Sequence, residues 1–492
     1  MKRVKIIVAS LLIGLSAVSC DNFLSELPDN RTQLDSKDKI ADLLVSAYPI
    51  YGYAGFTEIM SDNVDDNGKK SMTRDYNLSE YKWELEERNS QDSPSAYWDG
   101  CYEAIASAND ALEAIEKLGG GPELSHLKGE ALVARAYAHF MLVQIWSKAY
   151  NPATADSDVG IPYVDKPERV LIQHYDRGTV ADVYAKIEKD LEEGLPLLKD
   201  SYKQPKFHFN RTAGHAFASN FYLVKGDWEK VLEHSNYLGS NPKMQLRDYL
   251  AFSKLGYLEK YQAYARPTVN SNLLLVTAVS NHWRNNIWSR FWLTEDLNRE
   301  IFGQNAFGKN WLYSSISYTA SGTYVYPKLG EYFRLDDPSA GTGLPHVTYV
   351  LLSNDENYLN RAEALAMSGR IDEAVDALRL FTGTRTIGYK ASDDAKFTLA
   401  KLRSIYGNDA MKLSPYYDMN EDQAVVVAAV LSAKQREFMH EGKRWFDVKR
   451  HNIEVVHKLK DEADMILTKD DLRRQLPLPL HVVSAGIPDN PR

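Results

Sequence analysis

Apolar side chains recur along most of this chain with the spacing of an α-helix. From residue 93 onward they return every three or four residues, at Trp98, Cys101, Ile105, Ala108, Leu112 and Ile115. Ser93 and Pro94 are typical of a helix start, and the glycine-rich run 119–122 is typical of a helix end. Residues 124–147 repeat the pattern and are the expected antiparallel partner. Similar segments predict helices over residues 36–47 and 179–198.

Two later helical hairpins resemble each other. "NFYLVKGDWEKVLEHSNYL" and "EALAMSGRIDEAVDALRLF" align with Gly226 over Gly369 and Trp228 over Ile371. A small turn residue followed two positions later by a large apolar one is a tetratricopeptide feature. Because the copies lie far apart in the sequence, we predict a mainly α protein whose dispersed, tetratricopeptide-like hairpins form a right-angled scaffold, without a continuous array.

An irregular lobe is predicted between these hairpins, over residues 241–348. This segment is rich in Gly, Asn, Ser and aromatic residues, and its expected strands are few, near "NLLLVTAV" and "GTYVYPKL". Irregular segments of this length in a compact domain usually have a function. We therefore divide the scaffold into an N-terminal helical region (36–240), a ligand-facing lobe (241–348) and a C-terminal helical region (349–492).

The N-terminus has the pattern of an export signal. Three basic residues precede an uncharged run over residues 6–19. A helix of that length rises about 21 Å, which is shorter than the roughly 30 Å hydrocarbon core. The run therefore fits a signal peptide (1–19) better than a membrane-spanning helix. Ala17 and Ser19 are small, and Cys20 follows them as in a lipoprotein cleavage site, so we expect a lipid on Cys20 and a tether over 20–35. Ordinary secretion with an unmodified cysteine is the alternative.

Composition narrows the classes of function. The formal charge is −9, and removal of residues 1–19, which carry three basic groups, makes it −12. This balance argues against nucleic-acid binding, which needs basic stripes. The chain has two cysteines, Cys20 and Cys101, so a lipidated Cys20 leaves no disulfide. No later stretch has the length and apolar character of a transmembrane helix.

The segment "KQREFMHEGKRWFDVKR", residues 434–450, has the most specific pattern. Its charged residues recur at spacings of three or four, which would pair opposite charges on a helix surface. We therefore expect a charged helix that ties two elements together. A metalloprotease motif is excluded, because HExxH needs a second histidine where Arg444 stands. Motifs of serine hydrolases, P-loop proteins and dinucleotide-binding proteins are also missing from the sequence.

This segment resembles the C-terminal signature of the SusD/RagB family of outer-membrane lipoproteins. The matching residues are Glu437, Phe438, Glu441, Gly442, Arg444, Trp445, Asp447 and Arg450. "YWDGCYEAIASAND", "KGEALVARAYAHFMLVQIW" and "NYLNRAEALAMSG" resemble other family segments in the same order. The resemblance implies a non-enzymatic, glycan-binding lipoprotein at the cell surface. It also implies a SusC-like TonB-dependent transporter as partner, which the protein covers as a lid and supplies with oligosaccharide.

Candidate sugar-binding residues lie in the lobe. Pyranose rings present apolar C–H faces, so sugar sites combine flat aromatic rings with polar neighbours. "SNHWRNNIWSRFW", residues 280–292, has this composition, and we select Trp283, Arg284 and Trp288 from it. Trp311 and Tyr313 in "KNWLYSS" are further candidates. Core packing is the competing interpretation for all these rings, and we assign the neighbouring Phe291 and Trp292 to the core.

The acidic segment "SDNVDDNGKKS", residues 61–71, is a second candidate ligand site. Asp62, Asn63 and Asp66 are expected to accept hydrogen bonds from sugar hydroxyls, with a solvated turn or a helix cap as the alternative. An EF-hand that starts at Asn63 would need Glu at position twelve, where Arg74 stands, so calcium is disfavoured. We expect no cofactor and no metal.

Two other classes of function stay open. An extracellular glycosidase or peptidase on a helical scaffold is one, because paired catalytic carboxylates are defined by a spatial separation. A structural or adhesive surface subunit is the other.

Overall fold

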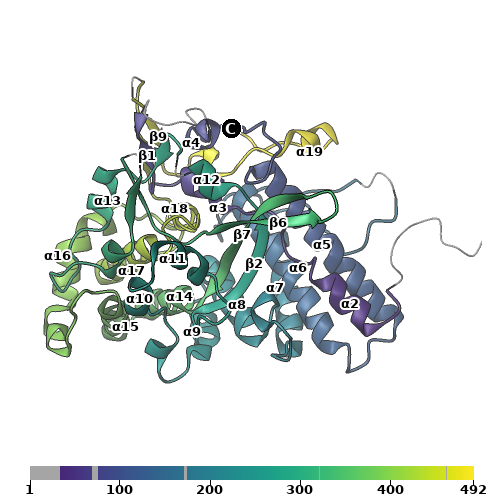
Figure 1. Ribbon diagram of the computed structural model, residues 1–492, viewed down its shortest axis with the longest axis horizontal. Helices are drawn as coiled ribbons and strands as arrows, with labels where there is room; N and C mark the ends of the chain where they lie inside the picture. Colours follow the sequence, from purple (N-terminus) through teal and green to yellow (C-terminus); the bar gives the residue numbers. More distant parts are fainter. Residues whose placement is uncertain (1–33, 69–75, 171–173, 287, 321, 461) are drawn as a thin grey trace, which may run out of the picture.

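The computed structural model describes residues 34–68, 76–170, 174–286, 288–320, 322–460 and 462–492. The predicted signal peptide and the predicted lipidation site Cys20 lie outside this range. The fold is mainly α-helical, with a few short strands between two groups of helices (Figure 1). The N-terminal group comprises α2 (Lys37–Leu44), α5 (Pro94–Lys117), α6 (Ser125–Trp146), α7 (Val180–Gly194), α8 (Arg211–Lys225) and α9 (Trp228–Ser235). The C-terminal group comprises α14 (Asn354–Met367), α15 (Ile371–Thr384), α16 (Leu399–Ala410), α17 (Glu421–Glu437) and α18 (Arg444–Arg450).

Local capping explains why the predicted helices α5 and α7 begin where they do. The Ser93 hydroxyl accepts a hydrogen bond from the Ala96 amide at 3.2 Å, and Pro94 occupies the first helical position of α5. Thr179 and Asp182 form a reciprocal capping box at the start of α7. α7 ends earlier than predicted, at Gly194, and its last turn tightens into a 3₁₀ helix over Leu195–Leu197.

The two similar hairpins are neighbours in space. Gly226 and Gly369 both adopt left-handed conformations, with φ of 74° and 76°, and close the α8–α9 and α14–α15 turns. α14 contacts both α8 and α9. The hairpins, although far apart in the sequence, therefore pack against each other as units of one scaffold.

The lobe contains a three-stranded antiparallel sheet in the order β2 (Asn272–Val279), β7 (Thr342–Ser353) and β6 (Glu331–Asp337). β2 confirms the strand predicted in "NLLLVTAV", and part of "GTYVYPKL" forms β5 (Thr323–Val325), which pairs with β4 (Tyr318–Ala320). β7 runs through residue 348, the predicted lobe boundary, and continues directly into α14. The short helices of the lobe are α10 (Tyr249–Ser253), α11 (Tyr257–Tyr264), α12 (His282–Asn286) and α13 (Glu295–Ile301).

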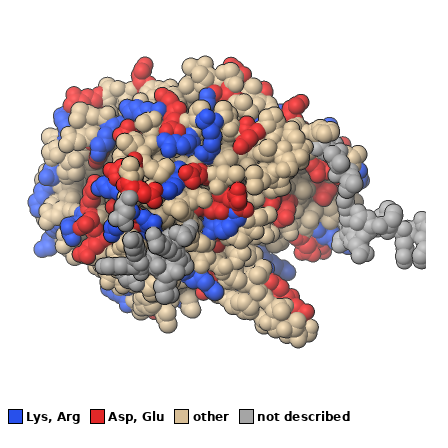
Figure 2. All heavy atoms as spheres, turned by 90° about the horizontal axis from the view of Figure 1, so that it is seen from above, with Lys and Arg blue, Asp and Glu red and all other residues tan. Residues whose placement is uncertain are grey.

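The other short elements lie near the chain ends or beside the lobe. β1 (Asp65–Asp66) pairs with β3 (Phe291–Trp292), and β8 (Val455–His457) pairs with β9 (Met465–Leu467). The remaining helices are α3 (Ala54–Ile59), α4 (Leu78–Tyr81) and α19 (Leu480–Ser484). Among the described residues, no helix is both long enough and apolar enough to cross a membrane. On the face that Figure 2 shows, basic and acidic side chains are interspersed without a continuous basic stripe.

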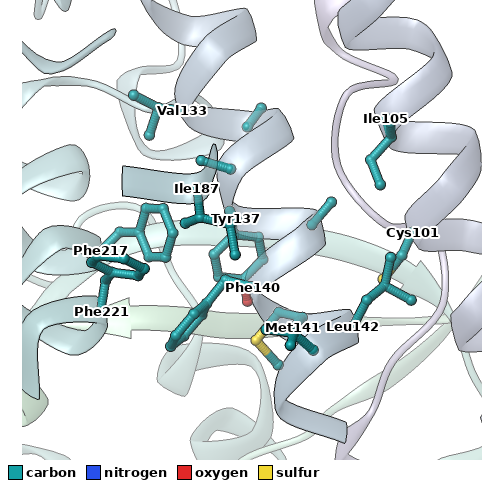
Figure 3. Close-up of a cluster of buried hydrophobic side chains, with 14 of the residues drawn as sticks. Cys101, Ile105, Val133, Tyr137, Phe140, Met141, Leu142, Ile187, Phe217 and Phe221 are labelled. Atoms are coloured by element: carbon teal, nitrogen blue, oxygen red, sulfur yellow. The ribbon is translucent and has the colours of Figure 1, made fainter. Parts of the chain in front are cut away.

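A large apolar core holds the N-terminal helices together. Cys101 and Ile105 of α5 lie opposite α6, whose other side meets Phe217 and Phe221 of α8 (Figure 3). Burial raises the pKa of the Cys101 thiol, so it stays protonated and packs as a small apolar side chain. Trp98 of α5 and Trp83, which precedes α5 in the sequence, are buried as well.

The signature segment 434–450 is not the single helix that we expected. α17 ends at Glu437, a turn follows, and α18 starts at Arg444. His440 and Gly442 in this turn have left-handed φ values of 70° and 72°, which an α-helix does not allow. Within this segment, one ion pair lies on a helix as predicted: Arg450 Nη2 is 2.8 Å from Asp447 Oδ1 in α18. The other charges pair with distant elements.

We call these contacts the signature network. Glu437 binds Arg385 at 3.1 Å, Glu441 binds Lys328 at 2.9 Å, and Arg444 binds Asp62. Further members are the pairs Lys443–Glu356, Arg450–Glu363 and Arg385–Asp355. These side chains are nearly all buried. Burial alone would raise the pKa of Glu363, but the Arg450 guanidinium holds it well below its usual range.

A residue of α3, Glu58, fixes the turn between α17 and α18. The buried Glu58 carboxylate accepts hydrogen bonds from the His440 and Gly442 amides at 2.8 and 2.9 Å. It also accepts one from the Asn63 side chain at 3.0 Å. The close approach of α3 leaves no room at Gly442, where a Cβ atom would lie 2.7 Å from the Ala54 Cα and closer still to Thr57. Glycine is therefore required at 442 by both conformation and space.

We predict that Gly442→Ala destabilises the protein by about 3 kcal/mol or more, because it adds a steric clash to the left-handed strain. Gly369→Ala is the matched control, since Gly369 has nearly the same φ but no atom within 4 Å of its Cβ position. It should cost only about 1–2 kcal/mol. Urea unfolding measures both, and equal losses would contradict the steric explanation.

Candidate ligand-binding site

An open cleft of about 600 Å³ lies between α11, the start of α12 and the sheet. We call it the aromatic cleft. Its rings come from four separate segments of the chain: Phe207, Tyr257 and Tyr261 of α11, Trp283 of α12, and Tyr332 of β6. Its polar lining includes Gln262, Arg266, Glu331 and Thr348. Flat rings beside hydrogen-bonding groups are the combination that a pyranose ring requires.

One wall of the cleft is built around Tyr261. Its ring is buried and meets Trp283 edge to face, with centroids 4.4 Å apart. Tyr257, one helical turn earlier, packs edge to face on Tyr261 at 5.4 Å and on Tyr318 at 4.8 Å. Tyr261 also hydrogen-bonds the Tyr318 hydroxyl. Tyr257 is half exposed and Trp283 is partly buried, so a fixed inner ring supports two rings that reach solvent.

The opposite wall is the start of β6. Tyr332 is 44% exposed and lies beside its cross-strand partner His346, with ring centroids 6.0 Å apart. Arg284 pairs with Glu331 and so ties α12 to β6 across the rim of the cleft. Gly330 permits close packing here, because a Cβ atom would lie 2.9 Å from the Tyr261 carbonyl oxygen.

Asp92 anchors the chain that leads into α12. Its carboxylate accepts hydrogen bonds from the Ser280 hydroxyl and the Asn281 amide, each at 2.7 Å. Burial raises the pKa of this carboxyl to about 6, although both hydrogen bonds act in the opposite direction. Asp92 therefore holds the segment immediately before Trp283 and titrates above the usual range for aspartate.

The structure places the predicted aromatic residues differently. Trp283 and Arg284 lie at the aromatic cleft, and Trp288 is 37% exposed but is not part of the described lining. Trp311 and Tyr313 are 3% and 1% exposed, and the Tyr313 hydroxyl donates to Glu437 of the signature network. The prediction of an exposed platform at Trp311 and Tyr313 is therefore wrong, because both rings pack in the core of the lobe.

The three acidic-segment candidates have structural partners. Asp62 forms two hydrogen bonds with the Arg444 guanidinium, at 2.7 and 2.8 Å. Asn63 is fully buried and bonds Glu58, and Asp66 is buried in an ion pair with Arg290. Asn63 and Asp66 thus hold the fold and present no free surface to a sugar.

Asp62, in contrast, lines a concave surface. It lies in a separate polar cleft of about 580 Å³, beside Glu300, Tyr406, Gln435, Arg436 and Lys458. Burial would raise the pKa of Asp62, but the charge and hydrogen bonds of Arg444 hold it below its usual value. The carboxylate is therefore ionised and already bound on one side.

The two segments selected from the sequence do meet. β1 of the acidic segment pairs with β3 of the tryptophan-rich segment, with Asp65 opposite Trp292 and Asp66 opposite Phe291. The residues that join them are structural, and Phe291 and Trp292 are buried as expected. Most of the aromatic rings that line the aromatic cleft are tyrosines that the sequence analysis did not select.

The signal for these tyrosines was weak. Tyr257 and Tyr261 are four residues apart, which places them on one face of a short helix. Tyr332 stands in a strand and has no such local partner. Among the described residues, no group of three or more His, Cys, Asp or Glu side chains is arranged to hold a metal ion.

Comparison with known families gives matches over most of the chain. A family model described as "Starch-binding associating with outer membrane" matches residues 22–223. A second model, described as "SusD family", matches residues 287–474 and includes the signature segment. No curated protein matches the chain.

Solved structures share this fold at low sequence identity. A SusD superfamily protein from Bacteroides thetaiotaomicron is 18% identical, with a TM-score of 0.64 over 92% of this chain and 99% of its own. One from Bacteroides fragilis is 16% identical, with a TM-score of 0.64 over 92% and 98%. A SusD-like carbohydrate binding protein from Bacteroides vulgatus is 17% identical, with a TM-score of 0.60 over 88% and 89%. These likenesses establish the architecture.

The raised pKa of Asp92 predicts a pH effect on stability. The folded state binds this proton more tightly than the unfolded chain, whose aspartate has a pKa near 3.8. The contribution of protonated Asp92 to the free energy of unfolding is complete below about pH 4 and is lost as the pH rises through about 6. Relative to Asp92→Asn, the wild-type free energy of unfolding should fall by up to about 3 kcal/mol between pH 4 and pH 7. Urea unfolding at several pH values measures this, and parallel profiles would contradict it.

Proposed function

The chain belongs to the SusD family, and on that premise we propose that it is a glycan-binding lipoprotein that captures oligosaccharides at the cell surface. The aromatic cleft carries this proposal. Tyr257, Trp283 and Tyr332 offer rings to solvent beside polar groups, in a space large enough for several sugar units. Trp283 and Arg284, selected from the sequence, are retained as ligand-binding residues in this proposal.

The lining of the cleft favours binding over hydrolysis. Glycosidases use a pair of carboxyl groups on either side of the scissile bond. The described lining of the aromatic cleft contributes one carboxylate, that of Glu331, and Arg284 is already bound to it. This arrangement supports a binding protein that releases its ligand unchanged.

Capture at the surface fits a role in import. We propose that Cys20 carries the lipid that holds the protein at the outer membrane, and that the captured oligosaccharide passes to a SusC-like TonB-dependent transporter. The export signal at residues 1–19 and the match to a family model described as associating with the outer membrane support this proposal. Co-purification of the transporter with the lipidated protein would test the partnership.

Substitution of the exposed rings tests the cleft directly. We predict that Trp283→Ala and Tyr332→Ala each weaken glycan binding about tenfold, because each removes a stacking surface. Affinity electrophoresis against a polysaccharide panel measures the loss. Tyr237→Ala is the control, since Tyr237 is 49% exposed and stacks on His215, away from the cleft.

Four outcomes would contradict this proposal or part of it. Unchanged retention of both cleft variants would remove the aromatic cleft as the site, and a loss with Trp288→Ala alone would move the site towards that ring. Reducing ends that accumulate during incubation with polysaccharide would instead indicate a glycosidase. Failure to bind any glycan, together with tight protein assembly, would favour a structural subunit.

The two cysteines provide a test of the anchor. We predict that Cys20→Ala moves the protein from the membrane fraction to the soluble fraction, because it removes acyl chains that contribute about 0.8 kcal/mol for each buried CH₂. Cys101→Ala, a change at a buried thiol, should leave the protein in the membrane fraction. Immunoblots of fractionated cells measure both, and membrane retention of the Cys20 variant would refute lipidation at this residue.

A further inference from the structure

Of the two charged residues that line the aromatic cleft, one has an ion-pair partner within the described part of the chain and the other does not. These residues are Glu331 and Arg266. Glu331 is neutralised by its ion pair with Arg284. Arg266 is exposed, and no carboxylate of the described residues forms an ion pair with it. Glu259 of α11 does not compensate, because it lies two residues from both Tyr257 and Tyr261 and therefore points away from their face of the helix.

The backbone of Arg266 is held rigidly. Its carbonyl oxygen accepts the Val269 amide at 3.1 Å, which closes a turn with Pro267 at the second position. The buried Asn272 side chain donates to the same carbonyl at 3.1 Å and to that of Tyr264 at 2.9 Å. The start of β2 thus fixes the turn from inside and leaves the guanidinium at the mouth of the cleft.

A second cation lies behind this turn. The Lys206 ammonium donates to the Val269 carbonyl oxygen at 2.5 Å, and its neighbour Phe207 lines the cleft. Burial and the positive charge of Arg247 lower the pKa of Lys206. Arg266 therefore contributes the uncompensated charge of the described cleft lining, a positive one, on a chain whose overall charge is negative.

We propose that the aromatic cleft selects acidic oligosaccharides. In this arrangement the carboxylate or sulfate group of one sugar unit pairs with the Arg266 guanidinium, while a neighbouring ring lies against Trp283 or Tyr332. Guanidinium matches the two oxygens of such anions with two parallel hydrogen bonds. The inference rests on the proposed glycan-binding function and adds the chemical class of the ligand.

Paired probes test this selectivity. The purified protein is titrated with polygalacturonate and alginate, each beside its carboxyl-reduced counterpart, and with chondroitin sulfate beside its desulfated form. Neutral starch and xylan complete the panel. We expect at least one acidic member to bind about tenfold more tightly than its neutral counterpart, with an advantage that declines between 50 and 300 mM NaCl. The carboxyl and sulfate pairs distinguish the two sources of the anion.

Two variants test whether the preference for acidic glycans depends on Arg266. Arg266→Gln keeps hydrogen-bond donors but removes the charge, and it should reduce the acidic advantage to less than twofold while neutral binding stays unchanged. Arg334→Gln, at an exposed arginine of β6 outside the cleft lining, is the matched control and should retain the full advantage.

The outcomes separate this inference from the function on which it rests. Tight binding of neutral glycans alone, or an acidic preference that survives Arg266→Gln, would overturn the inference and leave the glycan-binding proposal standing. Absence of binding to every probe in the panel would count against both.

Discussion

The architecture depends on charges that are buried where the chain turns between α17 and α18. Residues 434–450 supply both signs of charge, and their partners come from positions as distant as Asp62, Lys328, Glu363 and Arg385. Desolvation makes each such charge costly unless its partner is in place, so the net gain of a buried pair is small while the loss of one partner costs about 3–5 kcal/mol. The network therefore acts mainly by excluding other arrangements of these elements.

This constraint also explains how the lobe is attached to the scaffold. Glu437 accepts from Tyr313, and Glu441 accepts from Tyr264 at 2.6 Å, so the signature segment touches the lobe core as well as the helical hairpins. The Arg385 guanidinium, at the end of α15, also donates to the Glu437 carboxylate. One short segment thus aligns the helices, the sheet and the wall of the aromatic cleft.

Local chemistry made the long helices predictable. Ser93, Pro94 and Thr179 mark their starts through contacts within one turn, and the apolar period records which face is buried. The signature segment was misread because charges three or four residues apart satisfy a helix surface and a buried network equally well. The left-handed conformations of His440 and Gly442 distinguish a turn from a continuous helix. They depend on hydrogen bonds to Glu58, which is far away in the sequence.

The candidate site was only partly predictable for a similar reason. Arginine and asparagine neighbours favoured a surface position for Trp283, which is partly buried at the cleft, whereas Trp311 and Tyr313 also have polar neighbours in the sequence but are buried. Whether a ring reaches solvent is decided by packing between α11, α12 and β6, which the linear sequence does not record. The tyrosines that complete the cleft come from segments without any polar, tryptophan-rich signal.

The central strand of the sheet, β7, has two halves in different surroundings. β7 runs from the ribbon of residues 332–345, where Phe333, Leu335 and Leu344 are 44–59% exposed, into the buried strand that continues as α14. The inner half of β7 pairs with β2 and is largely buried. The outer half extends beyond the end of β2 and pairs only with β6. Exposed side chains of the outer half pack little against the rest of the molecule, so this ribbon can vary in sequence with less effect on folding than the inner half, which is tied to the scaffold.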